Sequence, residues 1–356
     1  MHRAAKYDPK QLTLTRDNGP LSLQQRLFYE KNGYVVVKKV FAPGTFDYIH
    51  RHYIDVCRNK SKYVGKRVIS LVRDINVVKG LDDKSHLPKE FSVIKMNGFC
   101  GIEGEDEVFT SYMRHRNLLP YIQQFIDSNV ASTASHMYVC KPPGLSKSTV
   151  HPMHQDLLYF PQGERDDTGA LTRRSKRKIV AAWTALGPCN IENGCLTMIP
   201  GSHWVGLRTH AYPKCDLVNL AYFGIVDLTD QELDSMVHLD MEDGDVVFFH
   251  PETIHGSGFN QRRVEEAHLD DAFRRAISVH FYEKGMEMAN WEGLPHGKTA
   301  RTANSPPNTK PSTSPSPRPS SKHTSNNPVL AKKFAFISRM ANLDVDIEKL
   351  LNNARM

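Results

Sequence analysis

Apolar positions in the first third of the chain recur at helical spacing. Residues 22–33 form one such stretch, which ends at an Asn-Gly pair typical of helix ends. Residues 45–58 form a second, with four apolar positions on one face: Phe46, Ile49, Tyr53 and Val56. Residues 109–128 predict two more helices, separated at Pro120 because proline lacks the amide hydrogen that a helix interior requires.

The middle and later parts of the chain alternate between short apolar runs and turn residues. Residues 34–38 form the first run. Four further segments follow, each bounded by Gly, Pro, Asn or Asp: 146–161, 193–203, 244–258 and 273–281. Short runs with such boundaries are typical of strands. With helices early and strands later, the pattern predicts an α+β fold, a double-stranded β-helix (a cupin-like jelly roll) with flanking helices.

Two of these segments carry residues of types that commonly bind metals. In 146–161, His154 and Asp156 are separated by a single residue, and a strand places such positions on the same face. His255 on a neighbouring strand would complete a set of two imidazoles and one carboxylate. This set is the facial triad of non-haem Fe(II) oxygenases, which leaves coordination positions open for a cosubstrate and oxygen.

Other histidines compete for these positions. His151 and His250 each lie close to a predicted ligand, but each directly precedes a proline, which cannot donate to a sheet ladder. Only His154 has a carboxylate two residues later. His255 lies at a glycine-rich strand end, where a ligand can approach closely. The sequence therefore favours His154, Asp156 and His255 as the ligands.

Over residues 20–285 the sequence resembles the phytanoyl-CoA dioxygenase family. The resemblance is carried by residues 25–38, by Trp183-Thr184 and by the four strand segments. It implies that the protein binds Fe(II), 2-oxoglutarate and an acyl-CoA, with His154, Asp156 and His255 as the iron ligands. It matches five further residues to contacts with 2-oxoglutarate: Arg274, Ser257, Trp183, Met137 and Lys95.

The resemblance also implies a reaction. Oxidative decarboxylation of 2-oxoglutarate to succinate would be coupled to hydroxylation of the carbon next to the thioester carbonyl, with ascorbate as a candidate reductant. The implied substrate is a 3-methyl-branched acyl-CoA such as phytanoyl-CoA, and the implied process is fatty acid α-oxidation. Two alternatives stay open: the same chemistry on another substrate, because fold does not fix substrate, and a non-catalytic acyl-CoA binding protein.

Arg274 and its neighbour Arg275 are separated by strand alternation. Arg274 shares a face with Ala276, Ser278 and His280, whereas Arg275 shares the opposite face with apolar residues. The polar set is expected to line the cavity. There a guanidinium can bind the distal carboxylate of 2-oxoglutarate in a bidentate manner, which an ammonium cannot do.

Composition narrows the class of protein. The net charge of +7 suits an anionic partner or simply a well-solvated surface, and no nucleic-acid-binding module is recognisable. No apolar run approaches the roughly 20 residues of a membrane span. The six cysteines are scattered without a CxxC pair, which favours reduced thiols in an intracellular compartment.

Composition also divides the chain into three parts. Residues 1–298 are predicted to form the Fe(II)/2-oxoglutarate dioxygenase domain. Residues 299–328 are rich in Ser and Pro and predict a disordered linker, since such a sequence cannot bury apolar surface. Residues 329–356 show apolar positions at helical intervals and predict a C-terminal helix and tail.

Two further segments have candidate roles. Residues 164–178 resemble an insertion relative to the family and contain the basic run 173–178, which is either a solvated loop, a clamp for the phosphates of coenzyme A or, less favoured, a nuclear-import patch. The chain ends Ala354-Arg355-Met356, similar to the Ser-Lys-Leu signal read by the peroxisomal import receptor. The expected location is therefore the peroxisome, and otherwise the cytoplasm.

Overall fold

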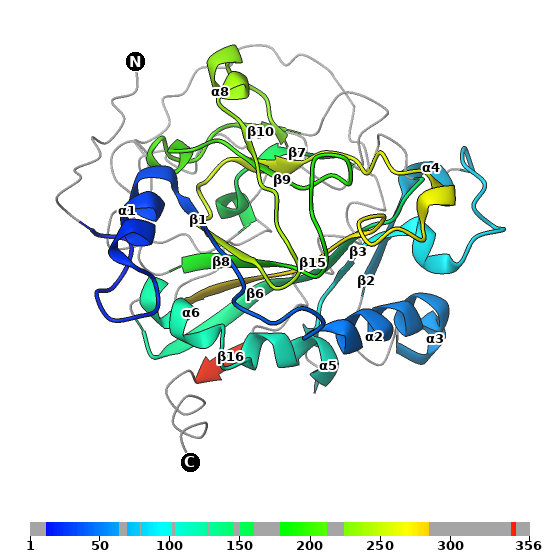
Figure 1. Cartoon of the computed structure of the whole chain (residues 1–356), viewed down its shortest axis with the longest axis horizontal. Helices are drawn as coiled ribbons and strands as arrows, with labels where there is room; N and C mark the ends of the chain where they lie inside the picture. Colours follow the sequence, from blue (N-terminus) through cyan, green and yellow to red (C-terminus); the bar gives the residue numbers. More distant parts are fainter. Residues whose placement is uncertain are drawn as a thin grey trace, which may run out of the picture.

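The fold is built around two antiparallel sheets that face each other. The computed structural model describes the following residues: 12–63, 70–78, 80–101, 104–126, 128–144, 150–159, 179–211, 224–284 and 343–346. Figure 1 shows the larger sheet across the middle of the molecule, with several helices below it and the smaller sheet above it.

The larger sheet has eight strands, and its order mixes segments from the whole chain. Along the sheet the order is β1-β13-β8-β15-β6-β3-β2, and β16 pairs with β6 beside β3. In that order the bounds are β1 (Tyr34–Val37), β13 (Val246–Phe249), β8 (Ile179–Ala185), β15 (Arg274–Glu283), β6 (Val130–Lys141), β3 (Val93–Asn97), β2 (Ser70–Arg73) and β16 (Leu343–Asp346). All of these pairings are antiparallel.

The smaller sheet carries two of the predicted metal ligands. Its order is β12 (Val237–His238), β9 (Leu196–Met198), β14 (His255–Ser257) and β7 (His151–His154). Two short hairpins lie outside both sheets: β4 (Cys100–Gly101) with β5 (Gly104–Glu105), and β10 (His210–Ala211) with β11 (Gly224–Ile225). Two facing antiparallel sheets with flanking helices confirm the predicted jelly roll.

The helices are short. The α-helices are α1 (Leu23–Asn32), α2 (Asp47–Arg58), α3 (Lys60–Tyr63), α4 (Ile75–Val78), α5 (Glu107–Thr110), α6 (Leu119–Phe125) and α8 (Asp230–Asp234). The 3-10 helices are η1 (Lys89–Ser92), η2 (Ser111–Arg114), η4 (Asp156–Tyr159), η5 (Ser202–Trp204) and η6 (Val264–Glu266). Of these, α2, α5 and α6 lie beneath the larger sheet in Figure 1.

The first predicted helix is confirmed, and its two ends have clear causes. Ser22 and Gln25 form a capping box at its start, each side chain accepting a hydrogen bond from the other residue's backbone amide. At its end, Gly33 adopts φ 80°, a left-handed conformation that favours glycine. A Cβ there would also lie 2.5 Å from Thr253 Oγ1, so glycine is required where α1 turns into β1.

Each face of the larger sheet packs into a different core. Its outer face packs against the helices, through residues such as Val35, Phe248, Ile277 and Phe281 on the strands and Ile49, Tyr53, Ile122 and Phe125 on α2 and α6. Its inner face packs against the smaller sheet, through residues such as Tyr34, Trp183, Val247, Phe249 and Ala276 on one side and Leu196 and Met198 on the other. The interior between the sheets is where the polar residues of β15 point.

Two expectations about helices are wrong in part. The break within 109–128 falls at residues 115–118, and Pro120 lies in the first turn of α6, where its missing amide hydrogen costs nothing. In the predicted C-terminal helix, the described residues form the strand β16, which pairs with Val130–Thr133 of β6. The alternating sequence Leu-Asp-Val-Asp suits a strand, and β6 extends past β3 far enough to offer a free edge.

Several predicted features fall outside the described residues. These are the Ser/Pro-rich linker 299–328, the insertion 164–178 and the tripeptide 354–356. Within the described part, the cysteines Cys57, Cys140, Cys189 and Cys195 are buried free thiols. None of the described helices is both long and apolar enough to cross a membrane.

Candidate metal centre

The pairing of β7 with β14 brings two histidines together. His154 lies directly opposite His255, whereas Ser257 lies opposite His151. Four residues of β7 (His151–His154) therefore lie opposite three residues of β14 (His255–Ser257), which is a β-bulge, and such bulges re-aim side chains. Gly256 allows the close approach, because a Cβ there would lie 2.8 Å from the backbone oxygen of His151.

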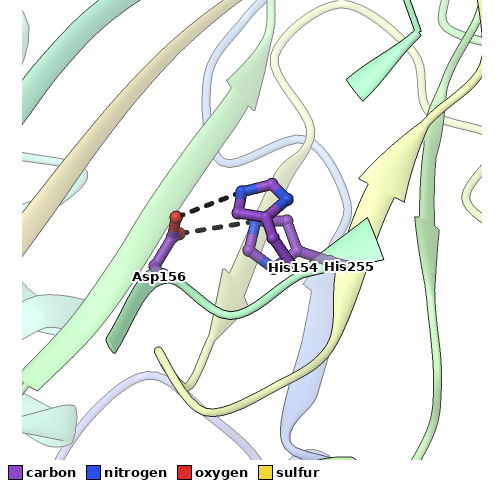
Figure 2. A group of neighbouring side chains, drawn as sticks. All are labelled: His154, Asp156 and His255. Carbon is purple, nitrogen blue, oxygen red and sulfur yellow. Dashed lines mark ion pairs between the residues drawn. The ribbon is translucent and has the colours of Figure 1, made fainter. Parts of the chain in front are cut away.

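Asp156 completes a group of three converging side chains. His154 Nε2 lies 3.4 Å from Asp156 Oδ1, and His255 Nε2 lies 3.4 Å from Asp156 Oδ2. Figure 2 shows both imidazoles directed at the carboxylate from the same side. The ligand atoms of all three residues lie within 4.8 Å of one another, and it is the one cluster of potential metal ligands found among the described residues. The three side chains predicted as ligands therefore meet in space.

Asp156 does not reach the two histidines through strand alternation, as the sequence predicted. The β7 strand ends at His154, and Asp156 is the first residue of η4. The carboxylate is thus placed by a turn rather than by strand alternation. The turn is held in position by a hydrogen bond from Leu157 N to Pro251 O (2.9 Å), which ties it to the segment leading to His255.

Backbone contacts fix the chemical form of both imidazoles. His154 Nδ1 lies 2.8 Å from Pro152 O, and His255 Nδ1 lies 3.0 Å from Thr253 O. A carbonyl oxygen only accepts, so each Nδ1 carries the proton and donates. In the neutral form of each imidazole, Nε2 therefore presents a lone pair toward Asp156, which is the tautomer that a metal ligand requires.

The charge states also suit a divalent cation. Burial lowers the pKa of His255 to about 4, although Asp156 opposes the shift. Burial alone would raise the pKa of Asp156, but the electrostatic influence of His255 and His280 and the hydrogen bond from His280 hold it well below its ordinary value. Near neutral pH the site thus offers a neutral imidazole and an ionised carboxylate, and this donor set fits Fe(II).

Comparison with known proteins decides the family. A family model described as phytanoyl-CoA dioxygenase (PhyH) matches residues 29–262. The peroxisomal phytanoyl-CoA dioxygenase of Bos taurus is 36% identical over 291 residues, covering 81% of this chain and 77% of that protein. The chain belongs to the phytanoyl-CoA dioxygenase family. The peroxisomal enzyme of Homo sapiens (36% over 280 residues, 78% and 73% covered) and a probable phytanoyl-CoA dioxygenase of Caenorhabditis elegans (34% over 271 residues, 75% and 77% covered) are similarly close.

Solved structures agree on the fold. EctD from S. alaskensis, crystallised with 2-oxoglutarate and 5-hydroxyectoine, superposes with a TM-score of 0.52 at 15% identity, covering 83% of this chain and 89% of that one. A form of EctD with bound Fe gives a TM-score of 0.51 at 13% identity, with 78% and 83% covered. At this identity the likeness supports the jelly-roll fold of this dioxygenase family member and nothing finer.

The residues that the family resemblance matches to 2-oxoglutarate lie on the inner face of the larger sheet or at the end of β14. In the register, Ser278 of β15 lies between Trp183 of β8 and Met137 of β6. In the next row, Ala276 lies opposite Val139, which pairs in turn with Lys95 of β3. Met137 is half-buried, whereas Trp183, Lys95 and Ser257 are buried.

Arg274 and Arg275 occupy opposite faces, as alternation predicts. Arg274 is 1% exposed, and its guanidinium carbon lies 5.6 Å from the centre of the Trp183 ring, a cation–π contact. Arg275 is only half-buried and belongs to the outer face, where its charge contributes to lowering the pKa of His50 after the larger effect of burial. Only Arg274 therefore faces the interior that contains the metal ligands.

Three residues near the site were not predicted from the sequence to be functional. His280 is fully buried, and its Nε2 donates to Asp156 Oδ2 at 2.8 Å. Gln155, between two ligands, is fully buried and donates to Gly206 O and Glu252 O. Lys141 ends β6 directly opposite Arg274. Strand alternation placed His280 on the polar face, but no sequence signal reveals which distant strand each residue will meet.

Proposed function

We propose that this enzyme is an Fe(II)- and 2-oxoglutarate-dependent dioxygenase that 2-hydroxylates a 3-methyl-branched acyl-CoA. The observation that carries the proposal is the convergence of His154, Asp156 and His255 in a chain 36% identical to proteins named phytanoyl-CoA dioxygenase. In this reading the three residues bind the iron, and Arg274, Ser257, Trp183, Met137 and Lys95 bind 2-oxoglutarate.

The bound metal would supply oxygen activation, and the chain's own residues supply geometry and charge. His154 and His255 present fixed lone pairs, and His280 holds one oxygen of Asp156 so that the carboxylate keeps its orientation. The buried guanidinium of Arg274 is suited to bidentate binding of the distal carboxylate of 2-oxoglutarate. Apolar side chains packed between the sheets, including Trp183 and Phe249, would keep water away from the bound metal.

The function is tested by following both products. Purified protein with Fe(II), 2-oxoglutarate, ascorbate and phytanoyl-CoA should release succinate and form a 2-hydroxyacyl-CoA of mass 16 greater, as expected for one added oxygen atom. Succinate without hydroxylation of this substrate would redirect the search to another substrate. No iron-dependent succinate release with any acyl-CoA would favour a binding protein. Omitting ascorbate shows whether the reductant is needed.

The basic run 173–178 provides a test of coenzyme A recognition. Guanidinium and ammonium groups bind phosphates, so replacing Arg173, Arg174, Lys176 and Arg177 together with glutamine should raise the Michaelis constant for the acyl-CoA and weaken its salt dependence. The Michaelis constant for 2-oxoglutarate should not change, which serves as the internal control. Unchanged constants for both substrates would identify the run as a solvated loop.

The C-terminal tripeptide provides a test of location. Several relatives are named as peroxisomal enzymes, and Ala354-Arg355-Met356 is similar to the Ser-Lys-Leu import signal. A fluorescent protein extended by residues 345–356 is therefore expected to colocalise with a peroxisomal marker. The same fusion without the last three residues is the control and should stay diffuse. Diffuse fluorescence with the tripeptide present would argue against import by this route.

A further inference from the structure

Lys141 is a buried lysine fixed against the end of the strand that carries His255. Its side chain is 1% exposed, at the end of β6. Its Nζ lies 2.8 Å from Ser257 Oγ and 3.4 Å from Ser257 O, and it also contacts Gly258 O. Three oxygens thus surround a group that carries three hydrogens when it is charged.

This arrangement sets the direction of the Ser257 hydroxyl. When Lys141 is charged, its ammonium has hydrogens to donate and no lone pair, so Ser257 Oγ accepts from it. The hydroxyl hydrogen of Ser257 then points elsewhere and is available to an anion in the pocket. Without the ammonium, the hydroxyl could rotate and donate to the carbonyl oxygens beside it.

The charges around Lys141 favour an anion at this place. Lys141 lies directly opposite Arg274 across β6 and β15, and like charges in that relation repel. Burial, followed by the Arg274 charge, lowers the pKa of Lys141 well below its ordinary value, whereas Cys195 opposes this shift. Lys141, Lys95 and Arg274 together contribute to lowering the pKa of the nearby His151, after the larger effect of burial. A dianion bound among these groups would favour the charged form of Lys141.

We propose that Lys141 is a positioning residue that holds the Ser257 hydroxyl as a hydrogen-bond donor to the distal carboxylate of 2-oxoglutarate. Arg274 would bind the same carboxylate directly, whereas Lys141 acts on it through Ser257. This role rests on the proposed function, because it requires 2-oxoglutarate to bind beside Ser257 and Arg274.

A double-mutant cycle separates this role from a structural one. Binding of 2-oxoglutarate to the Mn(II)-loaded protein is measured by calorimetry, without turnover. Ser257→Ala and Lys141→Met should each raise the dissociation constant about 10-fold or more, the loss expected for a hydrogen bond to a charged group. In the Ser257→Ala background, Lys141→Met should change the dissociation constant for 2-oxoglutarate less than about 2-fold, because the hydroxyl through which Lys141 acts is already absent.

Lys84 supplies the matched control. It is a buried lysine whose Nζ contacts a backbone oxygen, that of Gly144, and Lys84→Met should leave the dissociation constant unchanged. The Lys141→Gln protein retains a hydrogen-bond donor, so it should bind 2-oxoglutarate more tightly than the Lys141→Met protein. It takes the place of Lys141→Met if that variant does not fold. Mn(II) affinity, measured first, confirms that each variant keeps its metal centre.

Two results would overturn the proposal: an equal effect of Lys141→Met with and without Ser257, or no effect of Lys141→Met in either background. If the wild-type protein itself binds no 2-oxoglutarate, the proposed function fails instead. If it binds 2-oxoglutarate in an Arg274-dependent manner while Lys141→Met has no effect, only the role of Lys141 fails.

Discussion

Asp156→Ala is expected to abolish turnover while the protein stays folded. The substitution removes the only carboxylate of the His154, Asp156 and His255 group, and two neutral imidazoles bind Fe(II) weakly. Changes to residues that merely support ligands typically cost 10–100-fold in metal affinity, so loss of a ligand should exceed about 100-fold. The substitution removes the acceptor of the His280 hydrogen bond, so the melting temperature should fall, and circular dichroism at the assay temperature checks that the protein stays folded. Anaerobic Fe(II) titration and succinate release measure the two effects.

Asp106→Ala is the matched control for this experiment. Asp106 is also a fully buried aspartate that contacts a histidine, His52, at 2.9 Å, but it caps α5 on the helical side of the molecule. Its replacement should lower the melting temperature by removing a helix cap, without altering Fe(II) affinity. If Asp156→Ala binds Fe(II) and turns over like Asp106→Ala, the assignment of the metal ligands is wrong.

The sequence was sufficient where a short local pattern decides the structure. The period of two along residues 274–281 separates Arg274 from Arg275, and the structure places them on opposite faces. The Asn32-Gly33 pair ends α1 because glycine readily adopts the left-handed conformation found there. In both cases neighbouring residues alone determine the outcome.

The sequence was insufficient where segments far apart in the chain must meet. Asp156 and His280 are separated by 124 residues, and their hydrogen bond depends on how the turn after β7 of the smaller sheet faces β15 of the larger sheet. The contact of Lys141 with Ser257 likewise spans 116 residues. The strand β16 forms at a place where helical spacing was expected, because an open edge of β6 supplies partners that local propensity does not foresee.

Arg274→Lys is expected to raise the Michaelis constant for 2-oxoglutarate at least about 30-fold. Disrupting a buried, hydrogen-bonded charge pair costs about 2–5 kcal/mol, and each 1.4 kcal/mol is a factor of ten. Lysine keeps the positive charge, but it loses the planar pair of donors that matches a carboxylate and the stacking on Trp183. Initial rates at varied 2-oxoglutarate and saturating acyl-CoA measure the change, and the Michaelis constant for the acyl-CoA should move far less.

Arg275→Lys makes the comparison decisive, because it is the same substitution one residue later on the same strand. Its guanidinium lies near Gly187, 2.9 Å from where a Cβ of that residue would be, and belongs to the opposite face of the sheet from Trp183. This variant should therefore lower stability at most and leave the Michaelis constant for 2-oxoglutarate unchanged. Equal increases in both variants would mean that charge near the sheet, rather than a fork of donors facing the metal ligands, governs binding of 2-oxoglutarate. If the Michaelis constant for 2-oxoglutarate rises only in Arg274→Lys, the pair of donors on the inner face of the sheet binds 2-oxoglutarate.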